Sequence, residues 1–150
     1  MGRQFQIVAR SEKETREIAR ALGEELRRTV PLKRGALVFA LKGDLGSGKT
    51  TFIQGALKRI GIKKKTSSPT FVLVKRFPLA RRGIKNIYHV DAYRVKSARE
   101  LAPLGLQDIF QEKRSVVFIE WADKIRRAIP KNAIWISFAH DKPGERIIAF

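Results

Sequence analysis

The sequence predicts an α/β fold, in which strands and helices alternate along the chain and helices cover the faces of a sheet. Apolar runs of strand length alternate with segments whose apolar residues recur at helical spacing. A glycine-rich segment, residues 43–50, lies between a strand-like and a helix-like run and fits the pattern G-x-x-x-x-G-K-[ST]. The 150 residues are enough for one domain, residues 1–150, with its own core.

The N-terminal part predicts a strand, a helix and a second strand. Residues 4–9 alternate in polarity, as a strand with one buried face does. Ser11 and Glu14 have the spacing of a capping box, so a helix begins there. Its apolar residues recur every four positions, and Pro31 ends it. Residues 36–42 are mostly apolar and form the strand that leads into the glycine-rich segment.

The middle of the chain predicts a helix and a hairpin. The helix after the glycine-rich segment runs to about Ile60, where Gly61 can end it. After a basic loop, two strands follow that could pair with each other, residues 69–77 and 86–91, joined by a turn over residues 78–85.

The C-terminal part predicts two further helical segments and three strands. Residues 97–101 favour a short helix, and residues 122–129 a second one. Residues 115–119 are apolar almost throughout, which is typical of a strand buried on both faces. Residues 133–138 and 146–150 close the chain as two strands joined by a turn.

The glycine-rich segment predicts a phosphate-binding loop. Glycines let the backbone curl so that successive N–H groups point at phosphate oxygens, and the following helix adds its positive N-terminal end. In this pattern Lys49 would reach the β- and γ-phosphates, and Thr50 would place its hydroxyl on Mg²⁺.

Two acids at the ends of predicted strands could complete a magnesium site. Glu120 follows the strand 115–119, where a Walker-B-type carboxylate belongs, and Asp91 ends the strand 86–91. Hydrolysis needs a metal ligand and a group that orients the attacking water. The alternatives are that Glu120 only stabilises the N-terminus of the next helix, and that Asp91 pairs with Arg94.

Three more residues lie beside these motifs. Thr70 belongs to a hydroxyl-rich turn that resembles a switch segment closing over the γ-phosphate, with an ordinary turn as the alternative. His89 lies in mid-strand, and we expect a packed residue rather than a base. Trp121 could stack on a partner or substrate, or pack in the core.

Composition narrows the class of protein. Thirty-two lysines and arginines stand against 14 acids, a net charge of +18, and residues 58–99 hold thirteen of these bases and one acid. This segment could attract an RNA or an acidic protein, or it could be solvated surface. The absence of cysteine excludes disulfides and thiolate metal sites. No run is long enough for a membrane span or a secretory signal, so we expect a cytoplasmic protein without membrane contact.

Five segments, in order along most of the chain, resemble the motifs of one family. They are residues 43–52 (GDLGxGKTTF), 68–74 (SPTF), 88–94 (H-x-D-x-Y-R), 104–110 (LGL-E-E) and 119–122 (I-E-W-[PA]). Residues 144–146 are similar to its final G-x-R strand. The set resembles the TsaE family, also called YjeE, the ATPase of bacterial tRNA threonylcarbamoyladenosine synthesis.

This resemblance implies a P-loop NTPase-like three-layer domain with a mixed, mostly parallel sheet. It implies binding of ATP and Mg²⁺, slow ATP hydrolysis by the isolated chain, and docking onto a complex of TsaD and TsaB that modifies position 37 of tRNA. The phosphates would be held by Asp44, Leu45, Gly46, Ser47, Gly48, Lys49, Thr50 and Thr51. Lys49, Thr70, Asp91 and Glu120 would serve catalysis, and Thr50, Glu120 and Asp91 would hold Mg²⁺. Ser11, Thr15 and Arg146 would flank the adenine.

Two features depart from the family pattern. Gln107 stands where the family usually has an acid, which would alter an acidic docking contact. The net charge of +18 is higher than expected of the family and favours direct contact with tRNA through residues 58–99.

Three other functions remain as alternatives. A small regulatory GTPase would need an N-K-x-D segment, which the sequence lacks, and the D-x-x-G match at residues 141–144 follows both candidate magnesium acids and suggests chance. A small-molecule kinase could use the basic turn 75–85 as a lid. An RNA-binding module could grip backbone phosphate with the glycine-rich loop, and its affinity would fall steeply with salt.

Overall fold

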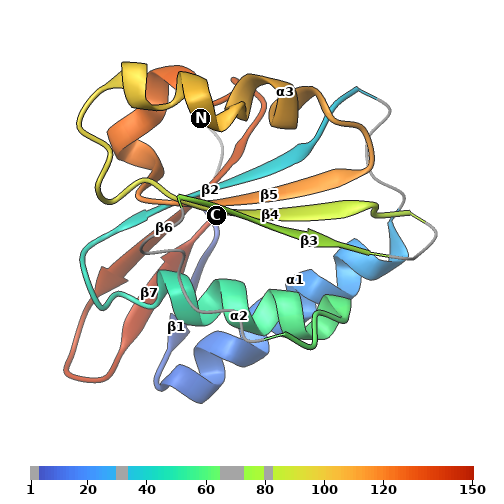
Figure 1. The fold of residues 1–150 in the computed structure, drawn as a ribbon. Coiled ribbons are helices and arrows are strands. Elements are labelled where there is room, and N and C mark those ends of the chain that lie inside the picture. Colours follow the sequence, from blue (N-terminus) through green and yellow to red (C-terminus); the bar gives the residue numbers. More distant parts are fainter. Residues whose placement is uncertain (1–3, 30–33, 65–72, 80–82) are drawn as a thin grey trace.

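The structure is a computed structural model that describes residues 4–29, 34–64, 73–79 and 83–150 (Figure 1). In chain order its elements are β1 (Gln6–Ala9), α1 (Glu12–Arg28), β2 (Leu37–Gly43), α2 (Lys49–Ile60), β3 (Val74–Pro78), β4 (Asn86–Asp91), the 3-10 helices η1 (Ala98–Glu100) and η2 (Ala102–Leu104), α3 (Leu106–Gln111), β5 (Ser115–Glu120), the 3-10 helix η3 (Ala122–Ala128), β6 (Ile134–His140) and β7 (Arg146–Ala149). None of the helices in these ranges is long and apolar enough to cross a membrane.

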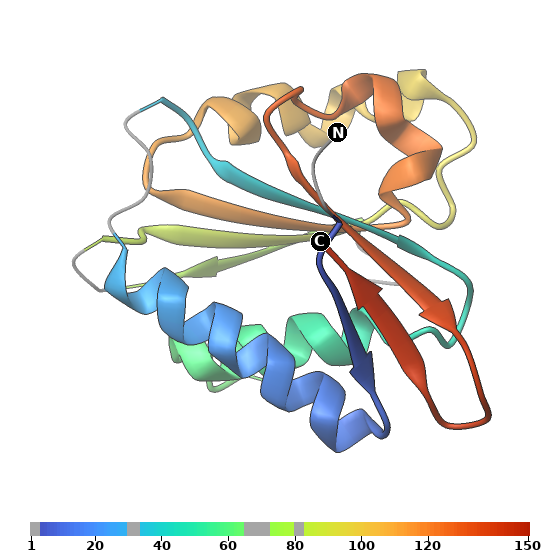
Figure 2. The ribbon, with the colours of Figure 1, turned by 180° about the vertical axis from the view of Figure 1, so that it is seen from behind.

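The described strands form one sheet in the order β1-β7-β6-β2-β5-β4-β3. The four central strands, β6, β2, β5 and β4, run parallel, and the outer pairings are antiparallel. Helices α1 and α2 cover one face of the sheet, and α3 with the 3-10 helices covers the other (Figures 1 and 2). The predicted three-layer α/β domain with a mixed sheet is therefore confirmed, with parallel pairing confined to its centre.

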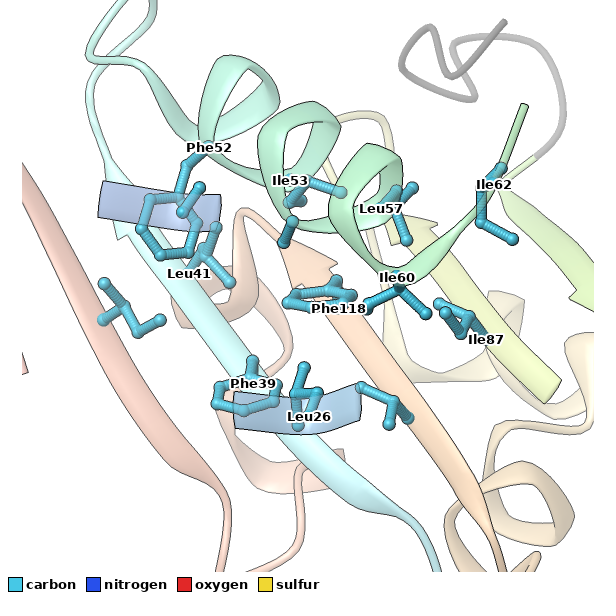
Figure 3. Packing of buried hydrophobic residues seen from close by; sticks show 14 of the residues in the cluster. Leu26, Phe39, Leu41, Phe52, Ile53, Leu57, Ile60, Ile62, Ile87 and Phe118 are labelled. Carbon is cyan, nitrogen blue, oxygen red and sulfur yellow. The ribbon is translucent and has the colours of Figure 1, made fainter. Parts of the chain in front are cut away.

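The core lies on both faces of the central strands. Phe39 and Phe118 stack with ring centroids 5.1 Å apart, beneath Phe52 and Leu57 of α2 (Figure 3). Residues of β2 and β5 that point the other way pack against α3 and η3. All of β5 is buried, which confirms the prediction of a strand covered on both faces.

Helix α1 begins at the predicted cap. Ser11 accepts a hydrogen bond from the backbone N–H of Glu14 at 3.1 Å, and the Glu14 carboxylate accepts from the N–H of Arg10 at 2.7 Å. The helix ends at Arg28, with Thr29 as its cap, so Pro31 does not mark the last helical residue. Pro31 itself lies outside the described residues.

Two glycines bring α1 and α2 together. A Cβ atom on Gly23 would lie 2.7 Å from the carbonyl oxygen of Ala56, and one on Gly55 would lie 2.9 Å from that of Arg16. These distances are shorter than a van der Waals contact, so the two helices approach closely only because both positions lack a side chain. The sequence analysis did not identify this contact.

Three other segments differ from the prediction. The helix predicted at residues 122–129 is the 3-10 helix η3, Ala122–Ala128, with a kink at Ile125 (φ −120°), whose side chain is buried. Helix α3 was not predicted, although apolar residues at 106, 109 and 110 have helical spacing. The strand predicted at 69–77 begins at Val74 within the described part of the chain, and it pairs antiparallel with β4 as the hairpin required.

A polar cluster fixes the end of β4 that is remote from the glycine-rich loop. Glu112 accepts hydrogen bonds from the Tyr88 hydroxyl, at 2.5 Å, and from the Asn86 amide, whose oxygen accepts from Arg76. Burial raises the pKa of Tyr88 to about 12, with help from Glu112. Burial alone would raise the pKa of Glu112, but the hydrogen bonds from Tyr88 and Asn86 outweigh it and the pKa is lowered.

Candidate functional site

The site residues meet at the carboxyl edge of the parallel strands. Strand β2 leads into the glycine-rich loop, while β4 ends at Asp91 and β5 at Glu120. Asp91 and Glu120 lie opposite each other in the β4–β5 pairing, and Glu120 lies opposite Leu41 in the β2–β5 pairing. Ligands of open α/β sheets bind at this edge, as the prediction required.

The loop has the backbone geometry of an anion cradle. The N–H of Ser47 donates to the carbonyl of Asp44 at 3.1 Å, which closes a tight turn. Gly48 follows in the left-handed region, with φ 102°, and α2 begins directly after it without a side-chain cap. The first N–H groups of α2 thus lack a side-chain acceptor, and a phosphate is a suitable partner for them.

Lys49 lies inside this loop, with only 4% of its surface exposed. Its Nζ donates to the carbonyls of Gly43 (2.6 Å) and Asp44 (2.9 Å) and to Oγ of Ser47 (3.3 Å). Burial lowers the pKa of Lys49 below its ordinary value, and the carboxylate of Glu120 opposes that shift. A phosphate in the loop would supply the compensating negative charge that these neutral acceptors lack.

Glu120 is almost fully buried, and both of its oxygens have partners. Thr50 donates its hydroxyl to Oε1 at 2.5 Å, and Nε2 of His89 lies 2.7 Å from Oε2. The Glu120 side chain therefore links β5 to β4 and to the start of α2. His89 is fully buried, as expected, but its contact with Glu120 was not predicted.

Asp91 lies beside Glu120 at the mouth of the site and is 8% exposed. Its Oδ1 accepts a hydrogen bond from the backbone N–H of Tyr93 at 2.9 Å, which orients the carboxylate. A carboxylate in this position can accept a hydrogen bond from a water molecule next to the loop.

The donor set fits Mg²⁺. Hydroxyl and carboxylate oxygens are its preferred protein ligands, and Thr50, Glu120 and Asp91 offer them at one edge of the sheet. No cage of three or more histidine or acidic side chains is present among residues 4–29, 34–64, 73–79 and 83–150. Mg²⁺ is usually held by one or two protein groups together with phosphate and water oxygens, so Thr50 with one of the two carboxylates would suffice.

A cleft of about 480 Å³ opens over these groups, which is within the range of small-molecule sites. It is lined by Glu12, Leu45, Gly46, Ser47, Gly48, Lys49, Thr50, Thr51, Asp91, Tyr93, Glu120, Trp121 and Arg146. Asp44 contributes its carbonyl to Lys49 from behind the loop. Thr70 lies outside the described residues.

The three residues predicted at the adenine separate into two groups. Arg146 lines the cleft, and its guanidinium donates to the carbonyl of Gly46 at 3.3 Å. Ser11 and Thr15 do not line it, because Ser11 caps α1 and the buried Thr15 hydroxyl donates to the carbonyl of Ser11. From this part of the chain, Glu12 lines the cleft instead.

An aromatic pair forms one wall, and the sequence analysis had singled out only one of its members. The rings of Tyr93 and Trp121 are 5.0 Å apart, and Nζ of Lys49 lies 4.0 Å from the Trp121 ring centre, within cation–π range. Trp121 adopts φ 57°, a left-handed conformation that is uncommon outside glycine and that clusters at functional sites. Tyr93 was detectable as part of the H-x-D-x-Y-R segment.

Comparison with known proteins gives one consistent result. The family model described as "Threonylcarbamoyl adenosine biosynthesis protein TsaE" matches residues 9–148. The TsaE protein of Bacillus subtilis (strain 168) is 36% identical over 113 residues, which cover 75% of this chain and 68% of that protein. TsaE of Haemophilus influenzae is 38% identical over 68% of this chain and 62% of its own length. TsaE of Treponema pallidum is 32% identical over 78% of this chain and 82% of its own.

A solved structure shows the same architecture. The crystal structure of YdiB from Bacillus subtilis superposes with a TM-score of 0.77 and 29% sequence identity, covering 100% of this chain and 86% of that one. The sheet and the helices on its faces are thus shared with a known fold.

Proposed function

The chain belongs to the TsaE family of threonylcarbamoyl adenosine biosynthesis proteins, and from this premise we propose that it is a magnesium-dependent ATPase of that pathway. The observation that carries the proposal is the 2.5 Å hydrogen bond between Thr50 and Glu120. It joins the last residue of the phosphate loop to a buried carboxylate, the two groups that hold Mg²⁺ in P-loop NTPases.

Each residue has a defined role in the proposal. The loop N–H groups and Lys49 bind the phosphates, and Lys49 exchanges the carbonyls of Gly43 and Asp44 for phosphate oxygens. Thr50 and Glu120 would hold Mg²⁺, which would supply positive charge that offsets the charge of the phosphates. Asp91 orients the attacking water, since its carboxylate lies beside Glu120 in register. Arg146 contacts the nucleotide from the rim of the cleft.

The proposal extends to the partners of the chain. Family membership and the motifs of the sequence support a subunit that acts on a complex of TsaD and TsaB, and that is needed for modification of position 37 of tRNA. In this role the isolated chain hydrolyses ATP slowly, because full activity depends on the complex. A role in tRNA modification supports a cytoplasmic location for the chain.

The test is ATP turnover by the purified chain, alone and then with a TsaD–TsaB pair and tRNA. We expect slow turnover alone and a requirement for the chain in tRNA modification. Glu120→Gln should leave binding of a fluorescent ATP analogue largely intact, because glutamine keeps an oxygen atom at this position. It should abolish turnover, because the negative charge beside the metal is lost.

Two results would contradict the proposal. Rapid hydrolysis without any effect on tRNA modification would exclude the pathway role while keeping the chemistry. Transfer of phosphate to an added small-molecule acceptor, in place of release as inorganic phosphate, would favour the kinase alternative.

A further inference from the structure

A second concavity, of about 760 Å³, is lined by residues of α1, of α2 and of the segment that follows α2. Six cations line this helical groove: Lys13, Arg16, Arg20, Lys58, Lys63 and Lys64. All six side chains are exposed, and Glu17 is the one acid that lines the groove among residues 4–29, 34–64, 73–79 and 83–150. Helices α1 and α2 pack against each other, and cations of both line the same concavity.

The groove charges follow from helical geometry. Lys13, Arg16 and Arg20 are spaced by three, four and seven residues, so they project from one face of α1 over about 10 Å of its length. Lys58 lies in the last turn of α2, and Lys63 and Lys64 follow that helix directly.

These charges are hardly compensated by acids. Among the described residues, one groove cation, Arg16, has a carboxylate within 4.0 Å. This is the carboxylate of Glu12, at 3.8 Å, and both side chains are exposed. The neighbouring Arg59 shows the contrast, because it lies 2.6 Å from Glu24, which also pairs with Arg27 and Arg28. Within the described part of the chain, the other five groove cations thus have no carboxylate within 4.0 Å.

We propose that the helical groove binds the phosphate backbone of RNA. The chemistry of the lining favours RNA over a protein partner, because the cores of protein interfaces are depleted of charge and enriched in aromatic residues. Nucleic-acid interfaces are much more positively charged. The lining residues within the described ranges include no aromatic side chain, so bases would not be stacked there and binding would depend little on sequence.

The groove also lies next to the nucleotide cleft. Thr51 of α2 lines the cleft, while Gln54 and Lys58, three and seven residues further on, line the groove. An RNA in the groove would thus run beside bound nucleotide. The choice of tRNA as the natural RNA rests on the proposed function, whereas the recognition of phosphate rests on the groove alone.

The experiment measures binding of a fluorescently labelled, unmodified tRNA transcript to the full chain from 50 to 300 mM KCl. The test variant is the triple Arg20→Gln/Lys58→Gln/Lys63→Gln. The control is Lys113→Gln/Lys131→Gln/Lys142→Gln, which removes the same charge from exposed sites outside the groove. A second variant, Lys63→Gln/Lys64→Gln, changes no helical residue and so keeps the test valid if the triple variant folds poorly.

We expect the groove triple to reduce the slope of log affinity against log salt by about 2, because each lost phosphate contact removes roughly 0.7–0.9. The control should change the slope by much less. Equal effects of both triples would overturn the proposal in favour of general charge attraction. Unchanged RNA affinity in the groove variants would also overturn it, and loss of TsaD–TsaB binding instead of RNA binding would assign the groove to a protein.

ATP turnover by the isolated chain distinguishes a failure of the RNA-binding inference from a failure of the proposed function. None of the groove substitutions touches a residue that lines the cleft, so basal turnover should be retained in the triple variant. Glu120→Gln, conversely, should lose turnover and keep its affinity for RNA without nucleotide.

Discussion

Replacing Thr50 by valine tests the contact on which the assigned metal site depends. Valine keeps the shape of threonine but cannot donate the hydrogen bond that Glu120 accepts at 2.5 Å. Hydrogen bonds to charged groups contribute about 1.5–3 kcal/mol, and Glu120 is 98% buried, so water cannot readily replace the donor. We expect Thr50→Val to lower the free energy of unfolding by about that amount, which corresponds to roughly 3–12 °C in Tm for a chain of this size.

The same change should remove the effect of Mg²⁺ on ATP binding. We take the contact of this hydroxyl with the metal to contribute about as much binding free energy as a hydrogen bond to a charged group, roughly 1.5–3 kcal/mol. Its loss then corresponds to a roughly 10- to 150-fold weaker affinity for Mg·ATP. Affinity for ATP in EDTA should change little, because the loop and Lys49 are intact. The assay is titration of a fluorescent ATP analogue with and without Mg²⁺, beside thermal unfolding.

Thr50→Ser is the matched control, because serine retains the hydroxyl. It should preserve the dependence on Mg²⁺ and most of the stability. If Thr50→Val binds Mg·ATP as tightly as Thr50→Ser, the assignment of this hydroxyl to the metal is refuted.

Three further predictions concern the loop, the helix pair and the polar cluster. Lys49→Ala should weaken ATP binding about 10- to 150-fold in a direct titration, because the phosphates lose their charged donor, and an unchanged affinity would remove Lys49 from the site. Gly55→Ala gains up to about 1 kcal/mol of helix propensity but places a Cβ 2.9 Å from the Arg16 carbonyl oxygen. Overpacking costs about 1–3 kcal/mol, so urea unfolding should show a net loss of stability. A gain of stability would show that α1 shifts freely. The folded-state pKa of Glu112 is lowered, so its contribution to stability is present above the unfolded-state pKa and is lost as pH falls through the folded-state pKa. Glu112→Gln should reduce this loss of stability at acid pH, measured by urea unfolding at several pH values. An unaltered pH profile of stability would contradict the hydrogen-bond account.

The sequence by itself determined those features that depend on neighbouring residues in the chain. The glycine spacing of residues 43–50, the capping box at Ser11 and Glu14 and the apolar run of β5 each encode a local geometry, and each is present in the structure. The family motifs added the identity of the fold, because five short patterns in one order specify it far better than hydrophobic periodicity does.

The tertiary structure alone decided which of these local features meet. Glu120 contacts Thr50 and His89 because β5 is inserted between β2 and β4, an order that no local pattern states. The structure also shows that Thr15 is buried, with its methyl carbon 3.6 Å from the position of a Cβ atom on Gly48.

The distribution of charge shows the same limit. The sequence placed the basic excess in residues 58–99, yet half of the groove cations come from α1, where acids nearly balance the bases along the chain. Helical periodicity brings Lys13, Arg16 and Arg20 to one face of α1, and the close approach at Gly23 and Gly55 sets α1 beside α2. Charge counted along a chain is a one-dimensional sum, whereas an electrostatic potential depends on distances in space, and only the packing of the two helices fixes those distances.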